Sequence, residues 1–359
     1  MRFLPTTEQR AFTDSLTALL TAADTPSVVR DWSRGDRTGG RALWSRVAEA
    51  GVFALAVPEA YEGMGPRPVE LALAFVELGR HAVPGPLVET VTAATLLAAL
   101  DDTGPAKRLL PALAAGESTA TVAQGEYALD ADTADVRLRV SGPERLSGVE
   151  KLSGRERVSG SESAAGAARA ATSAAELRLA PAPGPPRPSL DPARRLFPLP
   201  PGGALLATGP QVTAAMAHAL RIARLTTAAQ ALGVGLALVD KTVAYVRQRT
   251  QFGVPIGSFQ AVKHQLADAR IALEFARPLV LGAALTMTGQ DIAAAKVTAC
   301  EAAYATARTA LQLHGAIGYT AEYDLSLWLT KARALRTAWG SPDECRATVL
   351  GTGESPQWW

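Results

Sequence analysis

Two segments in the last third of the sequence concentrate residues that can bind an anion. The first, Arg247–Gln260 (RQRTQFGVPIGSFQ), places Arg249 among amide side chains and two phenylalanines, and the second, Gln312–Glu322 (QLHGAIGYTAE), contains two glycines. A guanidinium is always charged and donates hydrogen bonds in a fork, and glycine lets backbone N–H groups approach a ligand closely. Alternatively, Arg249 is a helix-end residue that stabilises the helix dipole, and Phe252 and Phe259 are core residues.

The composition argues against several other chemistries. Two cysteines, Cys300 and Cys345, cannot form a disulfide framework or a zinc site, and the four histidines contain no His-x-x-x-His pair. Lys and Arg (36) nearly balance Asp and Glu (34), so the net charge of +2 gives no basic footprint for nucleic acid. No apolar signal-peptide region opens the sequence, and no uninterrupted apolar stretch of about 18 residues could span a bilayer. We therefore expect a soluble, cytoplasmic protein without a metal site or a membrane span.

The elements that position the two segments begin with a helical region over residues 1–118. Apolar residues recur at helical spacing from Phe12 to Leu20, after a capping box formed by Thr6 and Gln9. Residues 54–58 are expected to be an extended connection, and a later helix should end near Gly79. The pattern predicts an amino-terminal helical domain.

The composition changes in the middle of the chain, over residues 119–205. Strands are predicted at 119–123 and 136–140, and a six-residue repeat (basic, aliphatic, Ser, Gly, variable, Glu) occupies 139–162. The repeat could form a β-solenoid or a binding strip, but four short copies bury little surface, which favours a duplication that extends a hairpin or loop. An Ala-rich stretch (164–175) and a Pro-rich stretch (181–192) follow. We expect a reduced β domain.

The last region, residues 206–359, is again helical. Long helices separated by short connections predict an antiparallel four-helix bundle. The predicted helices cover residues 212–249, 259–289 (with a kink at Pro278), 291–314 and 324–339. The fold class is therefore α+β, mostly α, with an amino-terminal helical domain, a small β domain and a carboxyl-terminal bundle.

Taken together, these segments resemble the acyl-CoA dehydrogenase family over nearly the whole chain. The amino-terminal match is Val57–Gly65 (VPEAYEGMG) and Glu77–Arg80 (ELGR). More specifically, Arg247–Gln260 is similar to the family's Arg-x-x-Phe-Gly…Phe-Gln segment, and Gln312–Glu322 to its Gln-x-x-Gly-Gly-x-Gly segment. The resemblance implies an α-β-α fold, bound FAD, a CoA-thioester substrate and a tetrameric assembly.

The resemblance also implies a role for the two segments. In the family they reach across an interface to the FAD of a neighbouring subunit, where the guanidinium suits the pyrophosphate. Ala316 replaces a usual glycine. Carried over by position, the cofactor-binding residues are Arg249, Gln251, Phe252, Phe259, Gln260, Gln312, Leu313, Gly315 and Ala316.

The family's catalytic base is missing from both of its usual positions. In the family a carboxylate removes the α-proton of the thioester while a hydride leaves the β-carbon for the flavin. Burial raises the pKa of this carboxylate. One position falls on Trp339, and the other, beside Arg224 on the long helix, falls on Ala223. Neither side chain can accept a proton. Asp343 and Glu344 could substitute only after a local realignment, and Arg224 is a candidate substrate-binding residue.

The chain also lacks the family's loop that holds a subunit's own flavin. Where the family has a Thr-Glu-Pro-Gly-x-Gly-Ser-Asp-like loop, this sequence has residues 122–127 (VAQGEY), and no aromatic strand follows. Both losses resemble the short, base-less subunits of actinobacterial acyl-CoA dehydrogenases. These pair with a full-length sibling in an α2β2 assembly that holds half the usual flavins, and the best-known pairs act on CoA esters of steroid side chains or rings.

Three hypotheses about function follow. The first is a non-catalytic subunit of a heteromeric, FAD-dependent acyl-CoA dehydrogenase that shares FAD with a full-length partner subunit and is inactive alone. The second is a self-sufficient flavoenzyme of the same fold, such as an oxidase, an N-oxygenase or a dehydrogenase of carrier-bound acyl groups, with a different base. The third is a scaffold that binds CoA esters without flavin.

Overall fold

The amino-terminal region of the molecule consists of helices. The computed structural model describes residues 4–123, 125–142 and 174–351. The first helix begins with the predicted capping box, in which Thr6 and Gln9 exchange hydrogen bonds. The helices are α1 (Thr7–Thr21), α2 (Thr25–Arg34), α3 (Thr38–Glu49), η1 (Ala54–Ala56), η2 (Glu59–Tyr61), α4 (Pro68–Arg80), α5 (Leu87–Ala98) and α6 (Thr103–Ala114).

One local prediction in this region is wrong. Residues 54–58 are not extended throughout, because Ala54–Ala56 form the 3-10 turn η1. The amide of Val57 donates to the carbonyl of Ala54 (3.2 Å), and Leu55 and Ala56 are buried. A buried backbone needs internal hydrogen-bond partners, so this segment forms a turn before it becomes extended at Val57.

A small β region follows the helices. Its main sheet has the order β1-β3-β4-β6, in which β1 and β3 are parallel and the other pairs are antiparallel. A second pair joins β2 and β5 in antiparallel register. The strands are β1 (Ala120–Val122), β2 (Tyr127–Leu129), β3 (Val136–Ser141), β4 (Glu176–Leu179), β5 (Leu196–Pro198) and β6 (Ala204–Thr208). β1 and β3 confirm the two predicted strands, whereas residues 143–162 of the repeat lie outside the described residues.

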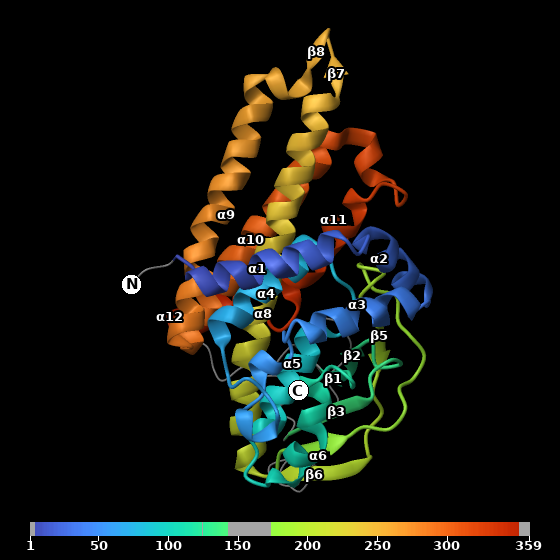
Figure 1. The fold of residues 1–359 in the computed structure, drawn as a ribbon, viewed down its shortest axis with the longest axis vertical. Helices are drawn as coiled ribbons and strands as arrows, with labels where there is room; N and C mark the ends of the chain where they lie inside the picture. Colours follow the sequence, from blue (N-terminus) through green and yellow to red (C-terminus); the bar gives the residue numbers. More distant parts are fainter. Residues whose placement is uncertain (1–3, 124, 143–173, 352–359) are drawn as a thin grey trace, which may run out of the picture.

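The carboxyl-terminal region is a helical bundle around α8, which runs along the long axis of the molecule (Figure 1). α10 packs against α8, α9, α11 and α12, and α9 continues through Pro278 as a single helix. The elements are α8 (Pro210–Gln248), β7 (Thr250–Gln251), β8 (Val254–Pro255), η3 (Ile256–Ser258), α9 (Gln260–Thr286), α10 (Gly289–His314), η4 (Gly315–Tyr319), α11 (Leu325–Thr337) and α12 (Pro342–Leu350). The predicted fold class, α+β and mostly α, is confirmed.

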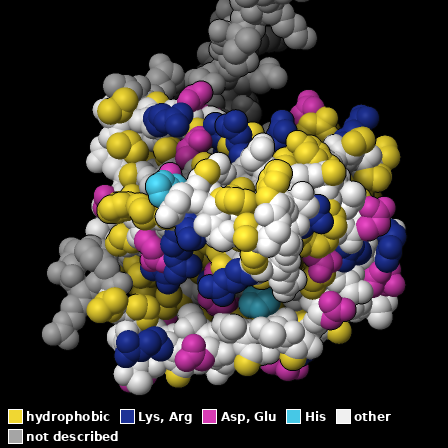
Figure 2. All heavy atoms as spheres, turned by 90° about the horizontal axis from the view of Figure 1, so that it is seen from above, with side chains coloured by type: hydrophobic (Ala, Val, Ile, Leu, Met, Phe, Trp, Pro, Cys, Tyr) yellow, Lys and Arg dark blue, Asp and Glu magenta, His cyan; other side chains and the backbone are white. Residues whose placement is uncertain are grey.

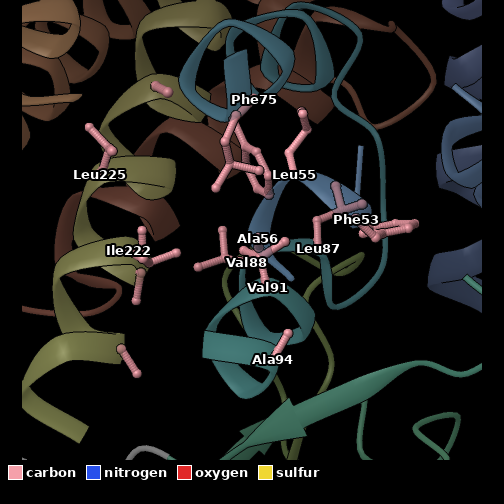
Figure 3. Packing of buried hydrophobic residues seen from close by; sticks show 14 of the residues in the cluster. Phe53, Leu55, Ala56, Phe75, Leu87, Val88, Val91, Ala94, Ile222 and Leu225 are labelled. Atoms are coloured by element: carbon pink, nitrogen blue, oxygen red, sulfur yellow. The ribbon is translucent and has the colours of Figure 1, made fainter. Parts of the chain in front are cut away.

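The amino-terminal helices and α8 share one core. Figure 3 shows side chains of α4, α5 and α8 converging, with Phe75, Val88 and Ile222 among them. α4 and α8 approach so closely that a Cβ on Gly79 would lie 2.1 Å from the carbonyl oxygen of Gln230. Glycine is therefore required at this crossing of two helices.

Among the described residues, one helix is long and apolar enough to cross a membrane by its length and composition alone. This helix is α8, and its most apolar stretch is completely buried inside the molecule. Core helices of globular proteins have the same property, so α8 is a core element that holds the two helical regions together.

Candidate functional site

The first predicted segment forms the tip of the molecule, where α8 turns into α9 (Figure 1). A two-residue turn, Phe252-Gly253, joins β7 to β8, and both residues have positive φ (54° and 80°). Such turns suit the twist of a tight hairpin, although a left-handed conformation is uncommon for phenylalanine. Phe252 is 91% exposed and meets Phe259 edge-on, with ring centroids 6.3 Å apart.

The second predicted segment lies at the end of α10, next to the end of α8. The ring of Tyr245 on α8 stacks on His314 with centroids 4.1 Å apart, and its hydroxyl donates to the carbonyl of His314 (3.4 Å). His314 is buried, its Nδ1 lies 2.7 Å from the carbonyl oxygen of Ala310, and burial lowers its pKa. His314 thus has a structural role, and its packing brings both segments to one end of the bundle.

The predicted cofactor-binding residues are chemically suited to an anionic, aromatic cofactor such as FAD. Gly315 caps α10 at φ 63° and has open space on its Cβ side. Figure 2 views the molecule from this end and shows basic and hydrophobic side chains lying interspersed. Leu313 is half-buried, and the exposed members of the set are Arg249, Gln251, Phe252, Phe259, Gln260, Gln312, Gly315 and Ala316. A guanidinium, amide donors and exposed rings fit the pyrophosphate and ring system of FAD, and the contacts themselves stay a prediction.

By contrast, Trp339 closes the position where the resemblance places the catalytic base. The residue is 2% exposed and has φ 58°. Its indole Nε1 donates to Oε1 of Glu89 on α5 (3.3 Å), and its carbonyl accepts from Nε of Arg224 on α8 (3.0 Å). Ala223, the other base position, is completely buried. Helix α5 therefore holds the indole and helix α8 holds its backbone, and neither usual position provides a proton acceptor.

Arg224 is the predicted substrate-binding residue. It is 5% exposed, and its guanidinium also lies against Gly340, where an added Cβ would be 3.0 Å from Nη2. Its observed contact is therefore the backbone that carries Trp339, and a role toward substrate stays a prediction.

The two proposed substitutes for the base are engaged elsewhere. The side chain of Asp343 is 94% exposed and pairs with Arg346 at 2.9 Å. Glu344 belongs to the capping box of α12, in which its amide donates to the hydroxyl of Ser341 and its carboxylate accepts from the Ser341 amide. Neither carboxylate replaces the base beside Trp339.

A buried ionic cluster that the sequence analysis missed surrounds Glu89. Arg194 lies 3.7 Å from the Glu89 carboxylate, and Lys331 lies 3.7 Å from Asp191. Asp130 accepts a hydrogen bond from the indole of Trp32 (3.3 Å). Among the described residues, no group of carboxylates, histidines and cysteines is arranged to hold a metal ion. The cluster ties α5 and α11 to the loops of the β region.

Burial shifts the proton affinities of this cluster. Desolvation raises the pKa of Glu89, and the positive charge of Arg194 opposes that shift. Desolvation likewise raises the pKa of Asp130 well above its ordinary value and lowers the pKa of Lys331. One sequence signal could have identified Glu89, because it is the single charged residue in the otherwise apolar helix Leu87–Ala98.

The β region shows how the expected flavin loop is replaced. β2 follows β1 closely and returns to pair with β5. A separate apolar cluster fills the space between these strands, and it consists of Ala123, Ala128, Ala131, Ala180, Phe197 and Leu199. In the described residues this part of the chain is a packed apolar core, and the loss of the chain's own flavin site stays a prediction.

The observed architecture is a helical domain, a small sheet and a long-helix bundle, with an exposed tip that carries cationic and amide side chains. Two sequence models match: the N-terminal domain of acyl-CoA dehydrogenase over residues 6–117 and its C-terminal domain over residues 212–350. The chain belongs to the acyl-CoA dehydrogenase family, which uses FAD and acts on CH–CH groups.

Individual relatives agree with this assignment. The acyl-CoA dehydrogenase IpdE2 of Mycolicibacterium smegmatis is 30% identical over 94% of this chain and 96% of the relative. Two solved structures share the fold. The ChsE4-ChsE5 complex from Mycobacterium tuberculosis has a TM-score of 0.78 at 21% identity, covering 99% of this chain and all of that chain. The Tcur3481-Tcur3483 steroid ACAD has a TM-score of 0.76 at 22% identity, covering 96% and 97%.

Proposed function

We propose that this chain is a non-catalytic subunit of a heteromeric acyl-CoA dehydrogenase. It completes the FAD site of a full-length partner subunit with its tip residues, and the assembly oxidises a CoA thioester with a steroid-derived acyl group. When bound, FAD accepts the hydride from the β-carbon. The α-proton is removed by a carboxylate of the partner, because this chain offers Trp339 and Ala223 at the two base positions.

The observation that carries this proposal is the burial and hydrogen bonding of Trp339. Glu89 and Arg224 hold the indole and the backbone that carries it. An indole is a large, rigid group, and at this position it fills the volume that the α-carbon of a thioester would need. An open site with a mobile aromatic lid would have left the ring exposed, whereas Trp339 is 2% exposed.

The exposed surfaces support a partner. The tip carries Phe252, and the outer side of α9 carries Ile271 (52% exposed), Phe275 (70%) and Leu279 (44%). These three residues are spaced by four positions, so they form one apolar stripe along the helix. Ion pairs of Glu274 with Arg270 and Arg277 flank the stripe. Apolar surface with a charged border is typical of protein interfaces.

The relatives support the same assembly and substrate class. One structural neighbour is a complex of two named subunits, ChsE4 and ChsE5, and another is named a steroid ACAD. Those names describe the neighbours. We extend the heteromeric assembly and the steroid substrate class to this chain because neither of its own base positions carries a carboxylate.

The test is co-expression of this chain with its genomic neighbour, followed by counting flavin per subunit. We expect a stable heteromer with one FAD for each pair of unlike chains, and a nearly colourless preparation when the chain is made alone. Phe275→Glu should reduce recovery of the heteromer, whereas Lys263→Glu, an exposed change at the start of the same helix, should not. A stoichiometric flavin spectrum from this chain alone would contradict the proposal.

A second candidate is a self-sufficient flavoenzyme with a different base, and one feature favours it. Glu89 is a buried carboxylate with a raised pKa beside Trp339, as a catalytic base would be. The two candidates predict different results for Glu89→Gln. A non-catalytic subunit keeps the turnover of its complex within a few-fold, whereas a self-sufficient enzyme loses about 10²–10⁴ in turnover.

A further inference from the structure

A cavity lies where the amino-terminal region meets the first half of α8. Its volume is ≈ 290 Å³, and its walls come from η1, the start of α4, the end of α5, α8 and the α9–α10 turn. Glu89, which contacts Trp339, lies in the first turn of α5, whereas Thr95, which lines the cavity, lies in its last turn. The cavity is therefore distinct from the closed base position.

The interior of this cavity is apolar and already formed. Leu55, Leu71 and Ile222 line it and are at most 7% exposed, so their positions are fixed by the core. Figure 3 shows Ile222 reaching from α8 toward the side chains of α5. The one buried hydroxyl in the wall, Thr95, donates to the carbonyl of Val91 (2.8 Å) and needs no partner from a ligand. Such walls accept hydrocarbon and offer it no hydrogen bond.

The polar groups of the cavity lie at its rim and are basic. Arg67 and His218 are both exposed, and Arg67 is oriented by a hydrogen bond from its Nε to the carbonyl of Met64 (3.1 Å). The lining, drawn from the described residues, contains no aspartate or glutamate. Desolvation lowers the pKa of His218, and the positive charge of Arg221 lowers it further, so the neutral imidazole is favoured. An apolar interior with the guanidinium of Arg67 and an imidazole N–H donor from His218 at its rim is complementary to an amphipathic anion.

We propose that this cavity binds an amphipathic carboxylate, with its hydrocarbon chain or ring against Leu71 and Ile222 and its carboxylate at Arg67 and His218. The site goes beyond the proposed function, because it uses neither the tip residues nor Trp339. The ligand bridges the η1–α4 region and α8, so it also stabilises the contact between the two helical regions.

The probe is decanoate, titrated by calorimetry into the full chain or its complex. Ala99, the exposed residue that ends α5, lines the cavity, so Ala99→Trp fills the cavity without disturbing the core. We expect Ala99→Trp to weaken decanoate binding by tenfold or more, since the bound chain loses its space, about 1.4 kcal/mol or more. Ala115→Trp, at the equivalent exposed end of α6, is the matched control and should bind normally.

Two further arms test the charge and the source of the ligand. Arg67→Glu and the uncharged probe decanol should each weaken binding by about threefold, as expected for one exposed ion pair, whereas Arg41→Glu on α3 should not. Decanoyl-CoA, whose acyl group has no free carboxylate, should not displace decanoate from the wild type, and displacement would assign the cavity to thioesters and overturn the proposal. Absence of decanoate binding, or undiminished binding by a folded Ala99→Trp variant, overturns the proposal.

Discussion

The tip of the molecule and the region around Trp339 each contain an aromatic residue, and the two side chains differ in exposure. Phe252 at the tip is 91% exposed in a two-residue turn, whereas Trp339 is 2% exposed and hydrogen-bonded to Glu89. Both residues have a left-handed backbone, at φ 54° and 58°. At the tip that conformation presents a ring outward, and at Trp339 it turns the ring inward.

The difference separates two functions that one subunit usually combines. Apart from the half-buried Leu313, the residues that would serve a cofactor outside this chain are exposed, and apart from Ala316 they keep the residue types that the resemblance implies. Residues that would serve the chain's own chemistry are buried and replaced, and Glu89 and Arg224 now hold the replacement in place. Under the proposed function, the exposed residues are the ones expected to contact FAD.

The strongest test of the comparison is Trp339→Ala in the co-expressed complex. Removing a fully buried indole should cost about 3–5 kcal/mol of unfolding free energy. Turnover should stay within a few-fold of wild type, because the indole performs no proton transfer. Chemical denaturation and steady-state assays with one CoA ester and an artificial electron acceptor measure both quantities.

Trp44→Ala is the matched control for this substitution. Trp44 is also buried (7% exposed) and donates to the carbonyl of Gly116 (3.0 Å), far along the chain from the base position. Both variants should lose comparable stability and retain turnover. Loss of turnover in the Trp339 variant alone, with a partner-base variant still active, would place catalysis in this chain.

The next largest effect is expected from Arg249→Ala at the tip. A charge-assisted contact with pyrophosphate is worth roughly 1.5–3 kcal/mol, so FAD affinity of the complex should fall about tenfold to a hundredfold. Arg247→Ala changes an exposed arginine two residues earlier and should retain FAD. The amount of flavin that remains after dialysis distinguishes the two variants. Equal retention would show that Arg249 is a surface residue without a contact to FAD.

Much of the fold was accessible from the sequence, because long helices carry local signals. The capping box at Thr6 and Gln9, the uninterrupted helix α8 and the strand at 136–140 all appear in the structure. The family motifs identified the two segments, and their cofactor role stays a prediction. The ten-residue helix α2 was not predicted. Nor were the short strands β2 and β4 to β8, since strands of a few residues depend on tertiary pairing more than on local pattern.

The buried ionic cluster could not be predicted for a related reason. Lys331 and Asp191 are separated by most of the bundle in sequence, and nothing local indicates that both become buried and adjacent. A lone charged residue on an apolar helix face, as at Glu89, indicates burial but not its partner. The closure around Trp339 is therefore a property of the tertiary structure.

A smaller effect should follow from Glu89→Gln, which keeps an acceptor for the indole of Trp339. Burial raises the pKa of Glu89 in the folded protein. Its contribution to stability is therefore greatest below the unfolded value of about 4.3 and is lost as pH rises through the folded value. Glutamine does not titrate, so its advantage should grow with pH in this window, by up to about 1.4 kcal/mol per pH unit.

Thermal unfolding between pH 4 and pH 8 measures this difference. Glu49→Gln, at the exposed end of α3, is the control and should follow the wild-type profile. If Glu89→Gln is instead destabilised increasingly as pH rises, the ion pair with Arg194 outweighs desolvation, and Trp339 is held mainly by charge.

The smallest effect on folding is expected at Phe252. Its ring is 91% exposed, so Phe252→Ala should change the unfolding free energy of the chain by less than about 0.5 kcal/mol. In the complex the same ring would contact the shared flavin, and loss of an aromatic contact worth about 0.5–1.5 kcal/mol should weaken FAD binding about two- to tenfold. Denaturation of the chain measures the change in unfolding free energy, and flavin titration of the complex measures the change in FAD affinity. Phe252 is thus expected to contribute to FAD affinity and not to unfolding free energy, whereas Trp339 is expected to do the reverse. A Phe252 variant that loses stability but keeps its flavin would contradict this difference between the two regions.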